Sequence, residues 1–155
     1  LLIDKKINFE YSIIGEGNYK EAILYAIHQH RLSSNVKLEG NLPPTEVKKK
    51  MEWADIYIQP SIQEGFCNAV LEAQAMKCLC VVTDAEGLSE NVIDGTTGWV
   101  VPRRSANSIA NSLLKIIDMS PDALTIIRDS AAIRVKEKFN LTQQNELFRN
   151  FYTQK

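Results

Sequence analysis

The sequence lacks the features that define several classes of protein. Its cysteine count is three and odd, which is too low for a disulfide framework. No apolar run approaches the ~18–20 residues that cross a bilayer, and no signal-peptide pattern opens the sequence. The net charge of -1 provides no basic field for nucleic acid. A length of 155 residues with 45% hydrophobic and 24% charged residues predicts one ordinary globular domain.

Metal chemistry also has little support in the sequence. Cys78 and Cys80 form a Cys-x-Cys pair without a second pair elsewhere, which is a poor zinc motif. His28 and His30 stand two apart on a predicted helix, so their side chains do not face each other. We therefore expect no metal site, and we expect the thiols to be buried and reduced, as in a cytoplasmic protein.

Short apolar segments alternate with helical ones along the sequence. The short segments are rich in β-branched residues, as in parallel strands covered on both faces. They predict strands over Phe9–Ile14, Val36–Glu39, Ile56–Gln59, Leu79–Thr83 and Trp99–Val101. Helices are predicted over Tyr19–Arg31, Thr45–Ala54, Asn68–Met76, Leu88–Ile93, Ala106–Asp118, Pro121–Lys138 and Thr142–Thr153. The alternation predicts an α/β fold with a doubly wound parallel sheet, that is, a Rossmann-like three-layer arrangement.

The most informative stretch runs from Glu64 to Glu72 and joins a predicted strand to a predicted helix. The first helical turn has unsatisfied backbone N–H groups, here expected from about Phe66 to Ala69, and the helix dipole adds positive charge. This combination suits a phosphate. Glu64 and Glu72 cannot bind phosphate, but their carboxylates can accept hydrogen bonds from hydroxyls on either side of it. A phosphate flanked by two polyols is a nucleotide-sugar.

Four stretches, in order along the chain, resemble the retaining glycosyltransferase group 1 family, whose enzymes have the two-domain GT-B architecture. Glu64–Glu72 is similar to the family's Glu-x7-Glu pattern, with Cys67 where glycine is usual. Ser12–Gly17 resembles the family's strand ending in Gly-x-Gly. Asn35–Gly40 resembles the strand before its base-binding loop, and Asp94–Pro102 resembles the turn into its last strand.

The resemblance implies that residues 1–155 are a donor-binding domain, the C-terminal half of a GT-B enzyme, with a terminal helix over 142–155. It implies that Glu64 is a catalytic residue that contacts the sugar hydroxyls and offsets positive charge as the glycosidic bond breaks. It implies that Glu72 accepts hydrogen bonds from the ribose 2′ and 3′ hydroxyls. The other implied donor-binding residues are Gly65, Phe66, Cys67, Asn68, Gly15, Gly17 and Leu42.

Simpler explanations exist for each of these residues. Glu64 fits a solvated loop, and Gly65 fits an ordinary turn. Asn68 fits a helix N-cap, and Glu72 fits a favourable charge near a helix N-terminus. Phe66 would contribute its backbone to the site, while its ring packs into the core.

The family resemblance also implies the partners. The full enzyme would transfer a hexose from a nucleotide-sugar, such as a UDP- or GDP-hexose, to a glycan or lipid-linked acceptor held by an N-terminal domain. It would need no cofactor and no metal. We expect a cytoplasmic enzyme, and for a lipid-linked acceptor also peripheral association with the inner face of the membrane.

In the family, a strand carrying Gly-Arg and then Lys-Gly precedes the first strand of this sequence. Its two cations neutralise the donor's diphosphate, and it is the central strand of the sheet, beside the switch point where ligands bind. Leu1–Ile7 looks like the tail of the helix that follows that strand. We therefore expect these 155 residues alone to be inactive, to bind nucleotide weakly and to self-associate.

Two other classes of function stay open. One is a non-catalytic nucleotide-sugar-binding or assembly module of the same fold, since fold does not fix function. The other is a sugar-nucleotide epimerase or a phosphorylase-like enzyme of the same architecture. The Glu-Gly-Phe context argues against the second class.

Overall fold

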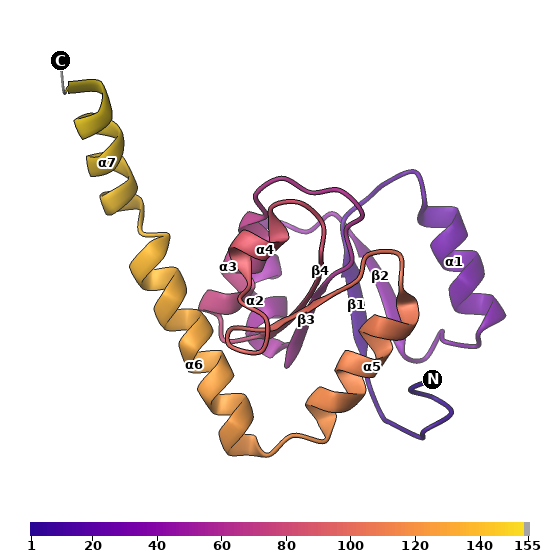
Figure 1. The fold of residues 1–155 in the computed structure, drawn as a ribbon. Coiled ribbons are helices and arrows are strands. Elements are labelled where there is room, and N and C mark those ends of the chain that lie inside the picture. Colours follow the sequence, from indigo (N-terminus) through magenta and orange to yellow (C-terminus); the bar gives the residue numbers. More distant parts are fainter. Residues whose placement is uncertain (154–155) are drawn as a thin grey trace. The chain divides into compact units, whose positions relative to one another are not determined.

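The computed structural model describes residues 1–153, apart from the side chain of Leu141. The last two residues of the predicted terminal helix 142–155, at positions 154–155, lie outside the described residues. The chain forms two compact units, Leu1–Lys50 and Met51–Lys155 (Figure 1). Whether the two units act as one donor-binding domain stays a prediction.

The first unit contains two parallel strands, β1 (Tyr11–Ile14) and β2 (Val36–Gly40), joined through helix α1 (Lys20–Gln29). The pairing shifts register between Ile13 and Ile14, where β1 ends. Helix α2 (Pro44–Trp53) begins in this unit and ends in the next. The crossover through α1 is the connection that parallel strands require.

The second unit contains a three-stranded parallel sheet in the order β3 (Ile56–Gln59), β4 (Leu79–Thr83), β5 (Trp99–Val101). Its helices are α3 (Asn68–Ala75), α4 (Leu88–Asn91), α5 (Ala106–Ile117), α6 (Pro121–Lys138) and α7 (Leu141–Thr153). Ser105 and Ser120 cap α5 and α6 by accepting hydrogen bonds from Ser108 N and Ala123 N.

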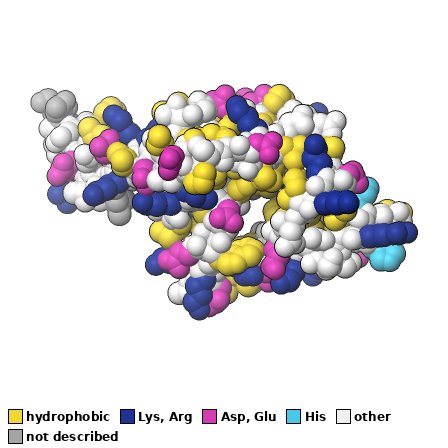
Figure 2. All heavy atoms as spheres, turned by 90° about the horizontal axis from the view of Figure 1, so that it is seen from below, with side chains coloured by type: hydrophobic (Ala, Val, Ile, Leu, Met, Phe, Trp, Pro, Cys, Tyr) yellow, Lys and Arg dark blue, Asp and Glu magenta, His cyan; other side chains and the backbone are white. Residues whose placement is uncertain are grey.

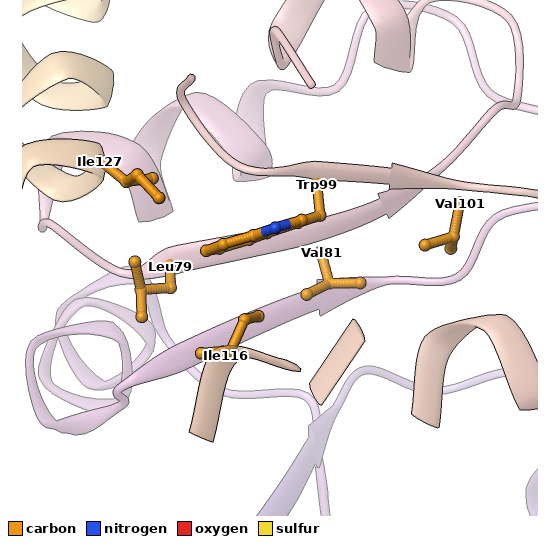
Figure 3. Packing of buried hydrophobic residues seen from close by; sticks show 6 residues of the cluster. All are labelled: Leu79, Val81, Trp99, Val101, Ile116 and Ile127. Carbon is orange, nitrogen blue, oxygen red and sulfur yellow. The ribbon is translucent and has the colours of Figure 1, made fainter. Parts of the chain in front are cut away.

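The core of the second unit lies on one face of this sheet (Figure 3). The cluster comprises Leu79 and Val81 of β4, Trp99 and Val101 of β5, Ile116 of α5 and Ile127 of α6. On the other face, the Cys80 sulfur lies 4.0 Å from the Val70 carbonyl oxygen of α3. Because both faces are covered, every residue of β4 is buried, as expected for the central strand of a parallel sheet.

The scarcity of glycine, seven in 155 residues, shows at the helix ends. Arg31 and Lys77 follow α1 and α3 with φ of 53° and 62°, in the left-handed conformation that glycine usually supplies there. After Lys77, Cys78 N donates to Ala73 O at 2.9 Å, which closes the helix with a Schellman-type hydrogen bond. Two basic side chains thus occupy glycine positions, where their charge also suits the helix C-terminus.

The predicted elements are all found, with ends that shift by one or two residues. The expected helical tail over Leu1–Ile7 has the form of a single turn, in which Lys5 N donates to Leu1 O. Lys6 N donates to Ile3 O and Ile7 N donates to Leu2 O, and Lys6 has φ of 57°. These are the bonds of a helix C-cap without the preceding turns.

The open strand edges yield a first prediction. In residues 1–153, β1 pairs only with β2 and β3 pairs only with β4, so each has an unpaired edge. Tyr11 and Ile14 of β1 are 36% and 37% exposed. Because open edges bind other strands, the 155-residue chain by itself should self-associate. Sedimentation velocity over a range of concentrations tests this, and a monomer at every concentration would contradict it.

Candidate functional site

The candidate site lies where the chain leaves β3 and enters α3, at the carboxyl edge of the three-stranded sheet. Glu64 is half-buried in this connecting loop. Its Oε2 accepts a hydrogen bond from Ser61 Oγ at 3.0 Å and a long one from Gln59 Nε2 at 3.5 Å. Its other oxygen, Oε1, has no hydrogen-bond partner in the described part of the chain. Glu64 is therefore fixed through one oxygen and can accept from a ligand with the other.

The ends of β4 and β5 hold this loop in place. Thr83 Oγ1, at the end of β4, donates to the Ser61 carbonyl oxygen. Arg103 follows β5, and its Nη1 donates to the Ile62 carbonyl oxygen at 3.2 Å. Asp84 accepts from Arg103 N at 2.8 Å and orients the guanidinium. Two successive loop carbonyls are thereby satisfied by neighbouring strand ends, which fixes the backbone of the loop that carries Glu64.

The start of α3 offers fewer free amides than the sequence suggested. Cys67 is the N-cap residue, and its N–H already donates to Asn91 Oδ1 at 3.3 Å. The Val70 N–H donates to the Cys67 carbonyl oxygen at 3.2 Å, and the Cys67 side chain makes no capping hydrogen bond. Burial raises the pKa of the Cys67 thiol, so the thiol stays protonated. Within residues 1–153, the amides of Phe66 and Asn68 are left without an acceptor.

A glycine contact sets the position of the loop. Gly87, at the start of α4, has φ of 83°, and a Cβ built there would lie 1.9 Å from the Gly65 carbonyl oxygen. Only a residue without Cβ permits this approach. Gly65 itself has open space around its Cβ position and no positive φ, so no feature of the unliganded fold requires glycine there. Its predicted role, close approach to a ligand, stays a prediction.

Glu72 lies on α3 and is exposed. Its carboxylate has no hydrogen bond or ion pair within residues 1–153, so both oxygens can accept from a ligand. It stands beyond the first turn of the helix, which contains no acidic residue. The dipole effect fades within that turn, so favourable charge at the helix N-terminus does not explain this residue.

Tyr57 of β3 lies near both glutamates. Burial raises the pKa of the Tyr57 phenol above its ordinary range, and the negative charges of the nearby Glu72 and Glu64 carboxylates add to the shift. The phenol is therefore protonated and acts as a donor. Its hydroxyl donates to Gln59 Oε1 at 2.7 Å.

One prediction and one of the simpler explanations for side chains in this segment are wrong. The Phe66 ring is 46% exposed and not in the core, because it packs on Phe139 at the end of α6 with ring centroids 5.5 Å apart. Asn68 is not the N-cap of α3, because Cys67 holds that position and Asn68 is the first helical residue.

The remaining candidates lie in the first unit. Gly15 follows β1 with φ of 121°, and its N–H donates to the Gly40 carbonyl at 2.8 Å. Gly17 has no positive φ, so the turn after β1 requires glycine at position 15. Leu42 follows β2 and is half-buried. The structure thus places Gly15, Gly17 and Leu42 together at the carboxyl ends of β1 and β2.

The three cysteines are buried and unpaired, as predicted. In the described part of the chain no three His, Cys, Asp or Glu side chains are grouped so that they could hold a metal ion. On the face that Figure 2 shows, basic and acidic side chains are interspersed. No helix among residues 1–153 has both the length and the apolar character needed to span a membrane.

Comparison with known proteins identifies the family. Residues 1–132 match the family model described as glycosyl transferases group 1, and the chain belongs to this family. The amylovoran biosynthesis glycosyltransferase AmsK of Erwinia amylovora is 31% identical over 138 residues, which cover 85% of this chain and 34% of AmsK. A glycogen synthase of Mycobacterium tuberculosis is 30% identical over 107 residues, covering 69% of this chain and 26% of that protein. The chain spans about a third of the length of the first curated relatives it matches.

Solved structures identify the fold as that of the C-terminal domain of GT-B glycosyltransferases. The Anabaena protein HepE, solved with UDP and glucose, superposes with a TM-score of 0.86 at 19% identity, over 93% of this chain and 40% of HepE. The C-terminal domain of the group 1 glycosyltransferase LpcC of Francisella tularensis gives a TM-score of 0.74 at 21% identity, over 90% of this chain and 91% of that domain.

Sequence reasoning missed the residues that hold the site together. Gly87 belongs to no recognised motif, and its role is to let the backbone of α4 lie close to the Gly65 carbonyl oxygen. Asn91 is fully buried on α4, but it stands in the mostly polar segment Leu88–Asn91, so the sequence carried no signal of its burial. Gln59 ends the strand that precedes Glu64 and Ser61 follows it, and their polar character at the carboxyl end of a strand was a signal that could have been used.

A pair of glycine substitutions tests the contact beneath the loop. Gly87 and Gly95 have similar φ of 83° and 71°, but Gly95 has no atom within 4 Å of its Cβ position. Gly95→Ala should cost about 1–2 kcal/mol for the left-handed conformation alone. Gly87→Ala should cost clearly more, because the Gly65 backbone must also move. Urea unfolding of the full-length protein measures both, and equal losses would show that the contact is unimportant.

Proposed function

We propose that this chain is the donor-binding domain of a retaining glycosyltransferase that transfers a hexose from a nucleotide-sugar to a glycan or lipid-linked acceptor. The observation that carries the proposal is the pair of glutamates that flank the start of α3. Glu64 keeps one carboxylate oxygen free, and Glu72 keeps both. The family membership and the HepE complex with UDP and glucose support the same donor class.

Binding of the donor follows from these groups. The free amides of Phe66 and Asn68, with the dipole of α3, suit the diphosphate. Glu72 would accept hydrogen bonds from the two ribose hydroxyls. Glu64 would accept from hydroxyls of the sugar. Gly15, Gly17 and Leu42 remain proposed donor contacts from the loops after β1 and β2.

The proposed reaction breaks the bond between the anomeric carbon and the diphosphate oxygen, and the electron pair leaves with the diphosphate. The acceptor hydroxyl forms the new bond on the same face of the sugar, and its proton passes to the departing diphosphate oxygen. The sugar becomes positively charged between these events. Glu64, fixed beside the sugar, would stabilise that charge electrostatically, and no metal or other cofactor is part of this proposal.

Relatives support the acceptor class only in general terms. AmsK is named for amylovoran biosynthesis and another relative, CapM of Staphylococcus aureus, for capsular polysaccharide biosynthesis. We propose a polysaccharide or its lipid-linked precursor as acceptor, in a cytoplasmic enzyme that can associate with the membrane surface. The acceptor would be bound by another domain of the full-length enzyme.

Glu72 is tested by removing its charge. Glu72→Gln keeps the size but weakens hydrogen bonds from two hydroxyls, each worth about 1.5–3 kcal/mol when the acceptor is charged. The affinity of the full-length protein for its nucleoside diphosphate should fall at least about tenfold. Calorimetry with UDP, GDP and ADP measures this, and Glu137→Gln on α6 is the matched control. Equal affinity for the ribo- and 2′,3′-dideoxy-nucleotides would refute the assignment.

For Glu64 we expect an effect on turnover and not on nucleotide affinity, unlike for Glu72. Because it is proposed to act on the sugar, Glu64→Gln should lower turnover and the discrimination between donor sugars, while the affinity for the bare nucleoside diphosphate stays nearly unchanged. Steady-state kinetics and calorimetry on the same preparation separate the two. If diphosphate affinity falls as much as turnover, Glu64 does not act on the sugar.

A further inference from the structure

A chain of hydrogen bonds runs from β3 to the candidate catalytic carboxylate. We propose that Tyr57 and Gln59 are positioning residues that hold Glu64 in its working orientation through Ser61. This inference rests on the proposed function, because it assigns these residues to the reaction in which Glu64 takes part.

The hydrogen bonds form one continuous path from Tyr57 to Glu64. The Tyr57 hydroxyl donates to Gln59 Oε1 at 2.7 Å. Gln59 Nε2 donates to Ser61 Oγ at 2.8 Å, and Ser61 Oγ donates to Glu64 Oε2 at 3.0 Å. Gln59 Nε2 also lies 3.5 Å from the same carboxylate oxygen. Gln59 and Ser61 therefore each accept one hydrogen bond and donate the next, and the path runs from the Tyr57 hydroxyl to one oxygen of Glu64.

Tyr57 determines which way the Gln59 amide faces. A side-chain amide has one end that accepts and one end that donates, and the two ends are nearly equal in size. The Tyr57 hydroxyl is protonated and donates, so it selects the Oε1 end of Gln59. The Nε2 end is then directed at Ser61 and Glu64. In the reverse orientation Oε1 would face the Glu64 carboxylate, which would bring two acceptors together without a proton.

The backbone of the path is equally fixed. Tyr57 and Gln59 stand two apart on β3, so both side chains lie on the same face of the strand. Their strand pairs with β4 in register, Tyr57 opposite Cys80 and Gln59 opposite Val82. Thr83 then holds the Ser61 carbonyl. The sheet therefore sets the direction of the path from Tyr57 to Gln59, and the hydrogen bond from Thr83 anchors Ser61 where the path enters the loop.

The path also fixes the direction of Oε1, the Glu64 oxygen that takes no part in it. Because Oε2 is engaged, the Glu64 carboxylate cannot rotate freely, and Oε1 is presented in one direction. A charge held in advance where positive charge develops is more effective than one that must first reorient. Loss of the path should therefore lower the rate of the chemical step and spare binding of the nucleotide, which Glu64 is not proposed to contact.

The experiment is a double-mutant cycle in the full-length protein. Tyr57→Phe, Gln59→Leu and the double variant are assayed with whichever of UDP-glucose, GDP-mannose and ADP-glucose the unmutated protein consumes, by release of the nucleoside diphosphate. Gln59→Leu should lower kcat by about 10–100-fold, since it removes donors to a charged group, and Tyr57→Phe by about 3–10-fold. KM and the Kd for the nucleoside diphosphate should change by no more than about twofold in each variant.

The double variant gives the decisive number. Because Tyr57 acts only through Gln59, Tyr57→Phe should have no further effect in the Gln59→Leu background. Independent structural roles would instead give multiplied losses, and that result would overturn the proposal.

Gln59→Glu sharpens the test. It can still accept from Tyr57 but has no donor for Glu64, so its kcat should fall at least as far as that of Gln59→Leu. Tyr11→Phe on β1 is the matched control and should leave all constants unchanged.

Crystal structures of the same variants test the path without any ligand. In Gln59→Leu and Tyr57→Phe the Glu64 carboxylate should leave its present orientation or become disordered, while the backbone from 56 to 67 stays in place. An unmoved carboxylate would overturn the proposal whatever the kinetics show. If the unmutated protein binds none of UDP, GDP and ADP, the proposed function fails instead, and the crystal structures still decide whether the path positions Glu64.

Discussion

The contact between Gly87 and the Gly65 carbonyl is the constraint on which the candidate site depends. The chain must leave β3 after Gln59, pass Glu64 and begin α3 at Asn68. Gly87 lets the start of α4 lie directly against the turn at Gly65. From there Asn91, on the same short helix, reaches the Cys67 amide. One short helix therefore fixes both the loop and the first turn of α3.

Helix α4 is too short to hold this position by its own hydrogen bonds, and α6 supports it. Arg134 of α6 donates to the Glu90 and Asn91 carbonyls at 2.6 Å and 2.9 Å, which satisfies the C-terminal end of α4. The same guanidinium lies 4.9 Å from the centre of the Phe139 ring, which packs on Phe66. The end of α6 thus contacts the site segment twice, through α4 and through the Phe66 ring. The exposure of Phe66 follows from this arrangement, because its partner lies at a helix end and not in the core.

Most of the fold could be predicted because it depends on periodicity and composition. The strands are short, apolar and β-branched, and Ser105 and Ser120 mark helix starts, so the element order follows from the sequence. Helix ends were less predictable. Arg31 and Lys77 occupy the left-handed position that glycine usually signals, and without the glycine the sequence gives no stop. The division into two compact units was also not foreseen, because it depends on which strands pair and not on what each strand contains.

In the candidate site, only the residues that belong to a sequence motif could be predicted. Glu64 and Glu72 stand in a recognisable pattern. Gln59 lies close to Glu64 in sequence but belongs to no motif. Gly87 and Asn91 contact the loop from a segment more than 20 residues away. The contact made by Asn91 carries an energetic penalty, because one of its polar atoms is buried without a partner. Asn91 Nδ2 is buried without a hydrogen-bond partner in residues 1–153, although its Oδ1 is used. An apolar residue there would avoid that penalty but would leave the Cys67 amide unsatisfied.

The first turn of α3 sets how an anion could bind under the proposed function. The Cys67 amide is held by Asn91, and the Val70 amide donates to the Cys67 carbonyl oxygen at 3.2 Å. Both bonds use backbone atoms of residue 67, so glycine, which is usual at this position in the family, would leave them in place. The proposed diphosphate contacts therefore fall to the remaining amides, those of Phe66 and Asn68 among them, with the helix dipole behind them. Fewer direct amides make a weaker anion site, so more of the proposed donor affinity would come from Glu72.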